Sequence, residues 1–556
     1  MTVVRTHYAV PSVPDILRGM FLILVSALIG LLLGGTAWAQ PFDVLLTNGR
    51  VVDGMGNPWY RADVGIRNGR IAAIGALKGR QAARTIDVQE QVIAPGFIDM
   101  MGGSSSPLLT EPASGQSKLR QGITTMFAGE GNSEAPRGDE PAVGGYRWRT
   151  FGEYFAILEK KGIPLNVVHN VGAAQIRRLV IGVEDRTPTA AELERMRKLV
   201  DEAMRDGAAG LSTALIYPPG IYARTAELVA MAEVVGRYGG IYSTHMRNES
   251  SKLLDAIAES MEIGKKAGVP VHIYHLKAAG QENWPLMAKA IEKIQQARDR
   301  GQDVTADIYP YIRNGLGLSA LVHPRHFAAG ADVFLPKLAD SEIRAQLRRE
   351  IESTSDWENW YRHVGSDWDN ILIAQAKDKT IEGKSIAEAA KARGEDAWTT
   401  FFELVKTDGV SVNPKSMNEE QKHLALRTPF VSFCTDASPT DIASATGAHP
   451  RAFGSFPRVL AQYVRQDRVI GMEEAIRKMT SLPANRLSLF DRGRIAVGMA
   501  ADLIVFDPTR IQDTATFAKP LAFPEGISHV LVNGKFAVEN GSGTKVMAGQ
   551  VLRHVR

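Results

Sequence analysis

Cysteine is almost absent from this sequence of 556 residues, in which Cys434 is the only one. A single cysteine cannot form an internal disulfide, and it cannot build a zinc site made of cysteines. Any bound metal must therefore be held by histidine and carboxylate side chains. Cys434 lies on an apolar run with no obvious base as a partner, so we interpret it as a small packing residue.

Long runs of one charge are absent too. The formal net charge of +4 is spread along the chain, and no run of five or six Lys or Arg occurs. We therefore expect no nucleic-acid partner. Hydrophobic residues make up 44% and charged residues 23%, which is typical of a soluble globular protein. The length favours one large domain plus a smaller one.

The N-terminus has the pattern of a targeting segment. Arg5 and Arg18 precede an apolar run at Met20–Leu33, and Ala37–Ala39 supplies a small-x-small cleavage pattern. The run is short for a membrane span, so residues 1–39 are predicted to be a signal peptide. The alternative is an uncleaved anchor. Either way the remaining chain is expected to be periplasmic or secreted, and no later run is long and apolar enough for stable membrane insertion.

Both ends of the remaining chain have the texture of short strands and turns. Val44–Val52 is predicted to form two strands joined at an Asn-Gly turn, and Ala62–Gly75 repeats that pattern around Asn68-Gly69. Asn533-Gly534 marks a third turn near the C-terminus. We expect residues 40–94 and 491–556 to form the two parts of one small β-sandwich.

Between these ends, apolar strand-like runs alternate with amphipathic helical segments such as Ala190–Asp206 and Lys252–Ala267. Eight such runs predict an α/β fold, a (β/α)8 TIM-type barrel whose strands are buried on both faces. The runs are Gly96–Met101, Ile123–Gly129, Leu165–Val171, Ala208–Leu215, Gly240–Met246, Val269–Leu276, Val304–Tyr311 and Phe430–Asp436.

More than a hundred residues separate the seventh run from the eighth, and this gap has helical pattern. We therefore assign barrel strands 1–7 to residues 95–322, an inserted, mainly helical subdomain to 323–428, and strand 8 with its following helices to 429–490. Insertions after barrel strands lie at the catalytic face, so this subdomain is expected to form a lid or a wall of the site.

Polar residues occur where the strands end. His245 and His275 end the fifth and sixth runs, Glu130 the second and Asp436 the eighth, and Lys277 follows on the side of the strand that carries His275. Because barrel active sites lie at the carboxyl ends of the strands, these side chains should meet. Two imidazoles and a carboxylate can hold zinc and leave a position open for water, and a further carboxylate can carry a proton. The alternative for each histidine is an ordinary hydrogen-bonded residue, and for His272 that alternative is favoured.

Several strings, in this order, resemble the N-acyl-D-amino-acid deacylases (D-aminoacylases) of the amidohydrolase superfamily, and the resemblance covers almost the whole chain after the signal peptide. The strings are Val92–Asp99, Gly122–Thr125, Gly210–Thr213, Leu215–Gly220, Thr244–Glu249, His275–Gly280, Asp307–Tyr311, Thr435–Asp436, His449–Arg451, Gly454–Leu460 and Gly493–Asp502.

The resemblance implies a barrel with a β-sandwich built from both chain ends. It implies zinc ligands at His245 and His275, and a general acid/base at Asp436. It also implies that Lys277, Arg451 and Tyr217 bind the substrate carboxylate and its surroundings. A cation pair suits a free carboxylate, because Arg binds carboxylates through two hydrogen bonds.

The sequence departs from the family pattern at two places. The His-x-His pair that normally follows the first strand is replaced by Met101 and Gly103, and Glu130 stands where the family usually has a cysteine ligand. We therefore predict one zinc ion (Zn2+) per chain, held by Glu130, His245 and His275, with water as the fourth ligand. A set of two histidines and one carboxylate also suits manganese or iron.

These features predict an exported zinc-dependent amidohydrolase that cleaves the amide of a small-molecule N-acyl-D-amino acid into a carboxylate and a D-amino acid. Two alternatives stay open. One is a related hydrolase of dipeptides, cyclic amides or other N-acyl compounds. The other is a catalytically inactive binding protein on the same barrel, which the missing His-x-His pair would favour.

Overall fold

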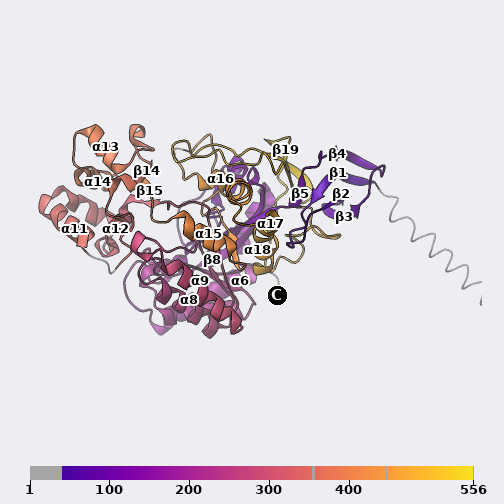
Figure 1. The fold of residues 1–556 in the computed structure, drawn as a ribbon. Coiled ribbons are helices and arrows are strands. Elements are labelled where there is room, and N and C mark those ends of the chain that lie inside the picture. Colours follow the sequence, from indigo (N-terminus) through magenta and orange to yellow (C-terminus); the bar gives the residue numbers. More distant parts are fainter. Residues whose placement is uncertain (1–40, 354–356, 408, 446, 555–556) are drawn as a thin grey trace, which may run out of the picture.

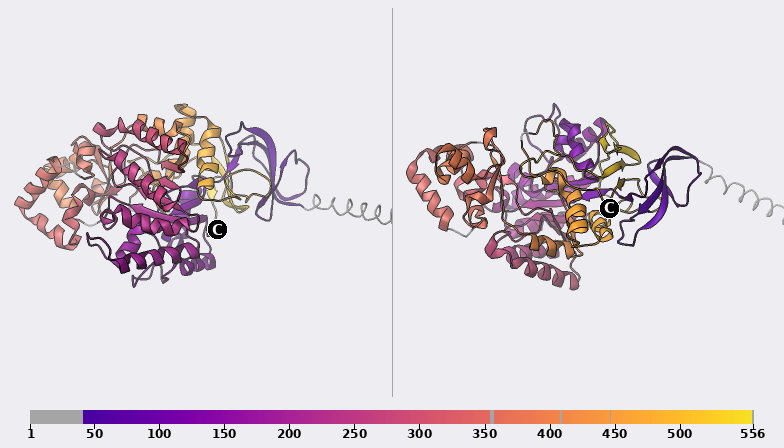
Figure 2. Two further views of the ribbon diagram at one scale, coloured as in Figure 1. Left: turned by 90° about the horizontal axis from the view of Figure 1, so that it is seen from below. Right: turned by 45° about the horizontal axis from the view of Figure 1, so that its top comes forward.

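The computed structural model describes residues 41–353, 357–407, 409–445 and 447–554. A central barrel carries a β-sheet unit at one end and a mainly helical insertion at the other, and all views show these two parts on opposite sides of the barrel (Figures 1 and 2). The predicted signal peptide, residues 1–39, lies outside the described residues. Within the described residues, no helix is long and apolar enough to cross a bilayer.

The eight predicted barrel runs each contain a strand of one parallel sheet, in the order β16-β12-β11-β10-β9-β8-β7-β6. The seam between the first and last strands is joined where Met100 N donates to Phe433 O at 3.4 Å and Asp436 N donates to Met101 O at 3.0 Å. The TIM-type barrel is thus confirmed. Its strands are β6 (Phe97–Asp99), β7 (Ile123–Ala128), β8 (Asn166–Gly172), β9 (Gly210–Ala214), β10 (Ile241–His245), β11 (Val271–Ile273), β12 (Val304–Ile308) and β16 (Val431–Phe433).

Local sequence signals set the helix ends. At α6, the Thr189 side chain accepts from Glu192 N while the Glu192 side chain accepts from Thr189 N, and the helix ends at Gly207 with a left-handed φ of 110°. The predicted helix Ala190–Asp206 is therefore confirmed to the residue. The barrel-associated helices are α2 (Ser106–Thr110), α3 (Gln116–Leu119), α4 (Phe151–Lys161), α5 (Ala173–Val180), α6 (Ala190–Asp206), α7 (Thr225–Gly236), α8 (Leu253–Ala267), α9 (Leu286–Asp299), α15 (Glu419–Arg427), α16 (Arg451–Arg458), α17 (Met472–Met479) and α18 (Ser481–Arg486).

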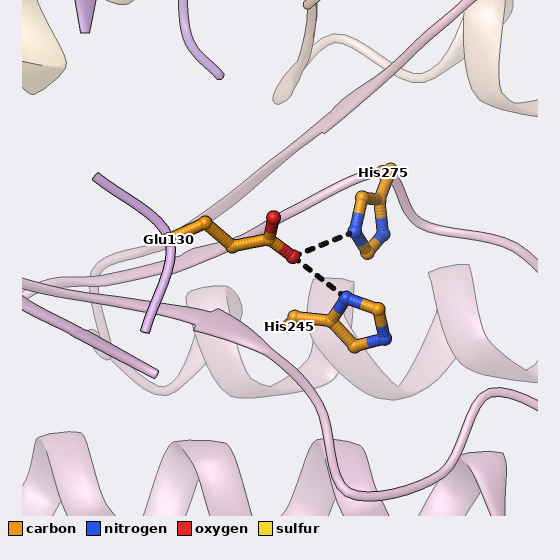
Figure 3. A group of neighbouring side chains, drawn as sticks. All are labelled: Glu130, His245 and His275. Carbon is orange, nitrogen blue, oxygen red and sulfur yellow. Dashed lines mark hydrogen bonds and ion pairs between the residues drawn. The ribbon is translucent and has the colours of Figure 1, made fainter. Parts of the chain in front are cut away.

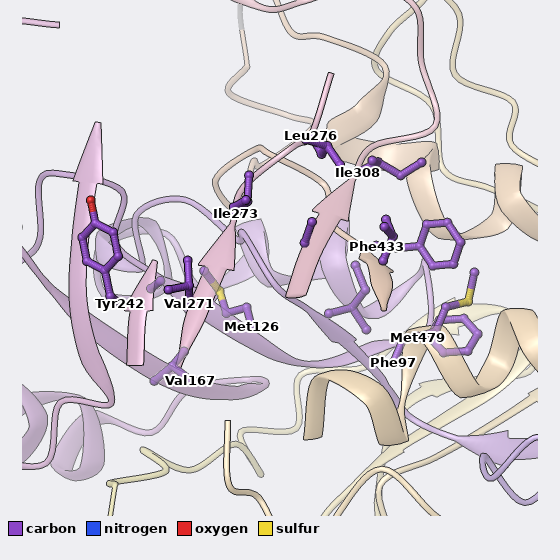
Figure 4. Packing of buried hydrophobic residues seen from close by; sticks show 14 of the residues in the cluster. Phe97, Met126, Val167, Tyr242, Val271, Ile273, Leu276, Ile308, Phe433 and Met479 are labelled. Atoms are coloured by element: carbon purple, nitrogen blue, oxygen red, sulfur yellow. The ribbon is translucent and has the colours of Figure 1, made fainter. Parts of the chain in front are cut away.

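The main core fills the space between strands and helices, and Figure 4 shows side chains of most barrel strands meeting in it beside Met479 of α17. Phe97 of β6 stacks on Phe456 of α16 with ring centroids 5.5 Å apart. Truncating a fully buried Phe to Ala costs about 3–5 kcal/mol, so this pair ties α16 firmly to the barrel. That contact matters for the site, because α16 begins at Arg451.

The two chain ends form one nine-stranded sheet in the order β20-β19-β18-β17-β5-β1-β2-β3, with β4 on β1, and they share one apolar core. The predicted turns at Asn68-Gly69 and Asn533-Gly534 are confirmed as hairpins. The strands are β1 (Phe42–Val51), β2 (Tyr60–Arg67), β3 (Arg70–Gly75), β4 (Ala82–Asp87), β5 (Val92–Pro95), β17 (Leu503–Phe506), β18 (Ile527–Val532), β19 (Lys535–Glu539) and β20 (Ser542–Gly543).

The predicted turn within Val44–Val52 is wrong, because β1 runs unbroken through Asn48-Gly49. The pairing register between β1 and β2 shifts between Leu46 and Gly49, and Asn48 has a φ of 58°. Asn48 N donates to Asp63 Oδ1 at 3.0 Å, and a Cβ at Gly49 would lie 2.3 Å from Ile93. A bulge in a continuous strand and a hairpin turn both use left-handed residues, so the same dipeptide suits both.

The insertion has an apolar core of its own and lies between β12 and β16. The insertion was predicted to span residues 323–428. In the structure it begins earlier, with a small antiparallel sheet whose first strand starts at Leu316. It ends before α15, because that helix packs on barrel helix α9. The elements of the insertion are β13 (Leu316–Gly317), α10 (Ala331–Phe334), α11 (Ser341–Ser353), α12 (Trp360–His363), β14 (Ile371–Gln375), α13 (Ile386–Arg393), α14 (Ala397–Val405) and β15 (Ser411–Pro414), with short 3-10 turns between them.

The last described residues leave the sheet unit, although the sequence assigned them to it. Val167 N donates to Gln550 O and Leu552 N donates to Val167 O, so the C-terminal tail runs along β8 of the barrel. The end of the chain thus fastens the sheet unit to the barrel.

Candidate metal and catalytic site

The structure brings every predicted site residue to one place. All of them line a single small cavity, with a volume of about 70 Å³, at the carboxyl ends of the barrel strands. These residues are Glu130, Tyr217, His245, His275, Lys277, Asp436 and Arg451. The remaining lining comes from Glu249, Tyr309, Trp360 and the segment Asn314–Leu316. Trp360 and Leu316 belong to the insertion, so the insertion forms one wall of the site, as the sequence predicted.

Glu130, His245 and His275 form a compact group in which one ligand atom of each residue lies within 4.8 Å of the others. Glu130 Oε1 lies 2.8 Å from His245 Nδ1 and 3.6 Å from His275 Nε2 (Figure 3). Burial of the Glu130 carboxyl opposes its ionisation, but the hydrogen bond from His245 and the proximity of both imidazoles outweigh burial and lower its pKa to about 2. The group is therefore an ionised carboxylate facing two imidazoles, a donor set that suits zinc.

The backbone at His275 is held in an unusual conformation, with a φ of 34°. Asp307 Oδ1 accepts a hydrogen bond from His275 N at 2.7 Å, and Asp307 Oδ2 lies 2.8 Å from His272 Nε2. The second ring nitrogen of His272 bonds Thr305 at 2.8 Å, so His272 is the satisfied core histidine that the sequence favoured. Such strain persists only where neighbours enforce it, and here they aim the His275 ring into the cavity.

Glu249 is the main residue of the site that sequence reasoning missed. It is 1% exposed, and its carboxylate lies 3.0 Å from His275 Nδ1, 3.6 Å from His245 Nε2 and 2.6 Å from Lys277 Nζ. Burial raises its pKa, but Lys277 and the two histidines outweigh burial and hold the pKa well below the usual range. Glu249 is thus an outer carboxylate that orients the His275 imidazole, as is common around bound metals.

Asp436 faces the metal group from the opposite strand end, and Arg451 Nη1 donates to its Oδ2. Burial raises the pKa of Asp436, although Arg451 opposes the shift. Asp436 has a φ of 48°. The guanidinium of Arg451 lies over the Tyr309 ring at 4.7 Å from its centroid, and Arg451 Nε has no hydrogen-bond partner among the described residues.

The two cations predicted to bind a substrate carboxylate differ in their surroundings. Lys277 is 2% exposed and already paired with Glu249, whereas Arg451 pairs with Asp436 and keeps an unpartnered donor. Tyr217 is 38% exposed, and its ring meets that of His245 edge-on with centroids 5.6 Å apart. Tyr217 therefore lies at the mouth of the cavity, and the side chains of Lys277 and Arg451 lie inside it.

The positions of the absent His-x-His pair are filled. Met101 packs in a buried cluster with Tyr274, Tyr309 and Cys434, the last confirmed as a buried packing residue. Gly103 has a φ of 74°, and a Cβ there would lie 2.5 Å from Ser438 Oγ, 2.7 Å from Ser438 N and 2.9 Å from Ser438 Cα. Met101 thus occupies the first position with an apolar side chain, and any side chain at Gly103 would collide with Ser438.

The chain is similar to known proteins over most of its length. The model of the amidohydrolase family matches residues 84–538. The chain is 34% identical to the D-aminoacylase of Alcaligenes xylosoxydans xylosoxydans over 92% of its own length and 98% of that protein.

Two solved structures are similar over 92% of this chain and 100% of theirs. One is N-acyl-D-glutamate deacylase from Bordetella bronchiseptica, complexed with zinc and a phosphonate inhibitor that mimics the tetrahedral intermediate (30% identity, TM-score 0.76). The other is a D-aminoacylase described as having a binuclear metal centre, with one-metal activation and second-metal attenuation (32% identity, TM-score 0.77).

Proposed function

The chain belongs to the amidohydrolase family, whose enzymes hydrolyse amide C–N bonds, and we propose that it is an exported, zinc-dependent deacylase of N-acyl-D-amino acids. The observation that carries this proposal is the convergence of Glu130, His245 and His275 beside Asp436 in one cavity. The D-amino-acid substrate class rests on the named activities of the relatives.

The residues present fit a zinc ion. They supply two nitrogen donors and one ionised oxygen donor, and the buried His245 Nε2 has no hydrogen-bond partner among the described residues. Glu249 supports the outer nitrogen of His275, which fixes the ring orientation. When bound, zinc supplies Lewis-acid polarisation of a carbonyl and acidification of water.

The side chains of the cavity then perform the remaining steps. Asp436 accepts the proton of the attacking water at a carboxylate oxygen and delivers it to the leaving nitrogen, so that the products are a carboxylate and a free amino acid. Its raised pKa suits this shuttle, because a general acid/base works best when its pKa is nearer the working pH. Arg451 and Lys277 bind the substrate carboxylate, and Tyr217 contacts the substrate at the mouth of the cavity.

The filled positions of Met101 and Gly103 support one metal per chain. A second ion would need ligands at the end of β6, where Met101 is 2% exposed among aromatic rings and Gly103 is packed against Ser438. Export is supported by Arg5, the apolar run Met20–Leu33 and the Ala37–Ala39 cleavage pattern. N-terminal sequencing of the protein made from the full chain should begin at Gln40.

The test is metal content by plasma mass spectrometry on wild type and Glu130→Ala, together with turnover of matched N-acetyl-D- and N-acetyl-L-amino acids. We expect close to one zinc per chain in wild type, a large loss in the variant, and turnover of the D-series. Turnover of other amides alone would favour the related hydrolases. A protein that binds no metal even after zinc is supplied would overturn the mechanism in favour of a binding protein.

A further inference from the structure

A second and much larger cleft adjoins the catalytic cavity. Its volume is about 950 Å³, and it shares Tyr217 and Trp360 with the catalytic cavity. One side consists of the loop after β9, the loop after β10 and helix α8, and the other side consists of the insertion segments around Ser319–Phe327 and Trp357–Trp360. The cleft therefore lies along the junction of barrel and insertion and opens beside the metal group.

The cleft lies at the end of the site that the substrate carboxylate does not use. Lys277, Arg451 and Asp436 line the catalytic cavity but not the cleft. If these residues bind the amino-acid half and its leaving nitrogen, the acyl half must extend past Tyr217 and Trp360. This step rests on the function proposed above.

The chemistry of the lining indicates what the cleft accepts. Both sides contribute buried apolar residues, among them Ile216 and Ala256 from the barrel and Val322, Trp357 and Trp360 from the insertion. Apolar surface on two facing sides suits an apolar ligand, and a volume of this size accommodates a group far larger than acetyl.

Most of the charged groups in the lining already have partners. Arg247 makes two bonds to Glu259, at 2.9 and 3.0 Å, and Glu358 lies 2.8 Å from His363. Arg224 pairs with Asp185, outside the cleft. Glu262 pairs with Lys266, and Lys252 and Asp255 are exposed. A hydrocarbon chain can enter the cleft without breaking any of these pairs.

We infer that this cleft binds the hydrocarbon chain of a long N-acyl group, so that the preferred substrates are amphiphilic N-acyl-D-amino acids with a chain well beyond acetyl. The carboxylate end lies at Arg451 and the amide at the metal group. The chain passes Tyr217 and Trp360 into the cleft. Each methylene that enters gains about 0.8 kcal/mol of apolar transfer, or about fourfold in kcat/KM when it is fully buried.

The test is kcat/KM for a series of acyl chains from two to fourteen carbons on one D-amino acid, below the micelle concentration. We expect a rise of about two- to fourfold per methylene up to a plateau. Ala258→Trp fills the cleft from α8, where Ala258 is half-buried, and should lower the ratio of dodecanoyl to acetyl kcat/KM at least tenfold. Ala328→Trp, at a position outside the cleft, is the matched control and should keep the wild-type ratio.

A second measurement does not depend on turnover. Calorimetric binding of dodecanoate should be detectable in wild type and in Ala328→Trp, and lost in Ala258→Trp. Turnover of N-acetyl substrates with no dependence on chain length would overturn the inference and leave the proposed function standing. Dodecanoate binding that is equal in all three proteins would also overturn it, whereas specific binding without any turnover would support the cleft and reject the deacylase.

Discussion

Placing histidines at positions 101 and 103 tests whether the packing at the end of β6 prevents the site from binding a second metal ion. We expect that Gly103→His, alone or with Met101→His, adds no second metal ion and destabilises the protein. Gly103 has a left-handed φ of 74°, and a Cβ at that position would approach three atoms of Ser438 within 2.9 Å. Any side chain other than hydrogen must therefore displace the loop that follows β16.

The expected loss of stability on substituting Gly103 is the sum of two free-energy costs. A residue other than glycine in the left-handed region costs about 1–2 kcal/mol, and overpacking a well-filled site costs about 1–3 kcal/mol. The sum is about 2–5 kcal/mol. With an unfolding entropy of about 2.1 cal/mol/K per residue, a chain of this size loses roughly 1 °C in Tm per kcal/mol. Gly103→Ala should therefore lower Tm by roughly 2–5 °C, and Gly103→His by at least as much.

The assays are thermal unfolding and zinc content of Gly103→Ala, Gly103→His and the double histidine variant. Ser438→Gly in the Gly103→Ala background removes the contact with Oγ but not those with Ser438 N and Cα, at 2.7 and 2.9 Å, so it should recover only part of the loss. A double histidine variant with wild-type Tm and two zinc ions per chain would refute the reasoning.

Three further predictions concern the site and its support. Asp436→Asn should lower kcat about 10²–10⁴-fold with zinc content unchanged; loss of zinc in this variant would instead make Asp436 a ligand. Glu249→Gln should weaken zinc about 10–100-fold in a chelator competition, because it removes the carboxylate beside His275 Nδ1; unchanged affinity would argue against an orienting role. Arg177→Met should lower the free energy of unfolding, measured with denaturant, by about 3–5 kcal/mol, because Glu227, 3% exposed, loses both hydrogen bonds from Arg177 Nη1. Adding Glu227→Gln should restore part of that stability, because the hydrogen bonds from Arg177 Nη2 to the carbonyls of Glu184 and Arg186 stay lost. A double variant as unstable as the single one would speak against an unpaired charge as the cause.

The barrel could be predicted because the same sequence pattern, an apolar run followed by an amphipathic helix, recurs along the chain. Eight apolar runs alternate with amphipathic helices, and each run contains a strand of the parallel sheet. The turn at Asn48-Gly49 could not be predicted correctly, since an Asn-Gly pair with Asn48 in the left-handed region suits a bulge as well as a hairpin. In the structure β1 continues through the pair because it pairs with β4 before it and with β5 after it, and both partners lie about forty residues away in the sequence.

The site residues that lie at the ends of barrel strands could be predicted from the sequence. Glu130, His245, His275 and Asp436 follow strands whose carboxyl ends meet at one rim. Glu249 was missed because it lies in a loop, where the direction of the chain depends on tertiary contacts such as that of Glu249 N with Glu358. The spacing of four residues from His245 is a signal that could have raised it. Trp360 comes from the insertion, and no local pattern says which of its aromatic residues faces the cavity.

The residue proposed to carry the proton is positioned by the seam at which the barrel closes. Asp436 N donates to Met101 O at 3.0 Å, and Thr435 N donates to Asp99 Oδ1 at 2.9 Å. Lys118, fully buried, bonds Asp99 Oδ2 at 2.7 Å and also contacts Thr435. These contacts join the first and last strands and hold the left-handed backbone of Asp436, so barrel closure and catalytic geometry are coupled. Lys118→Met should therefore lower kcat and Tm together, whereas Asp436→Asn should lower kcat with little change in Tm. Paired kinetics and thermal unfolding check this, and a destabilised Lys118→Met that keeps wild-type kcat would show that the seam does not position the proton carrier.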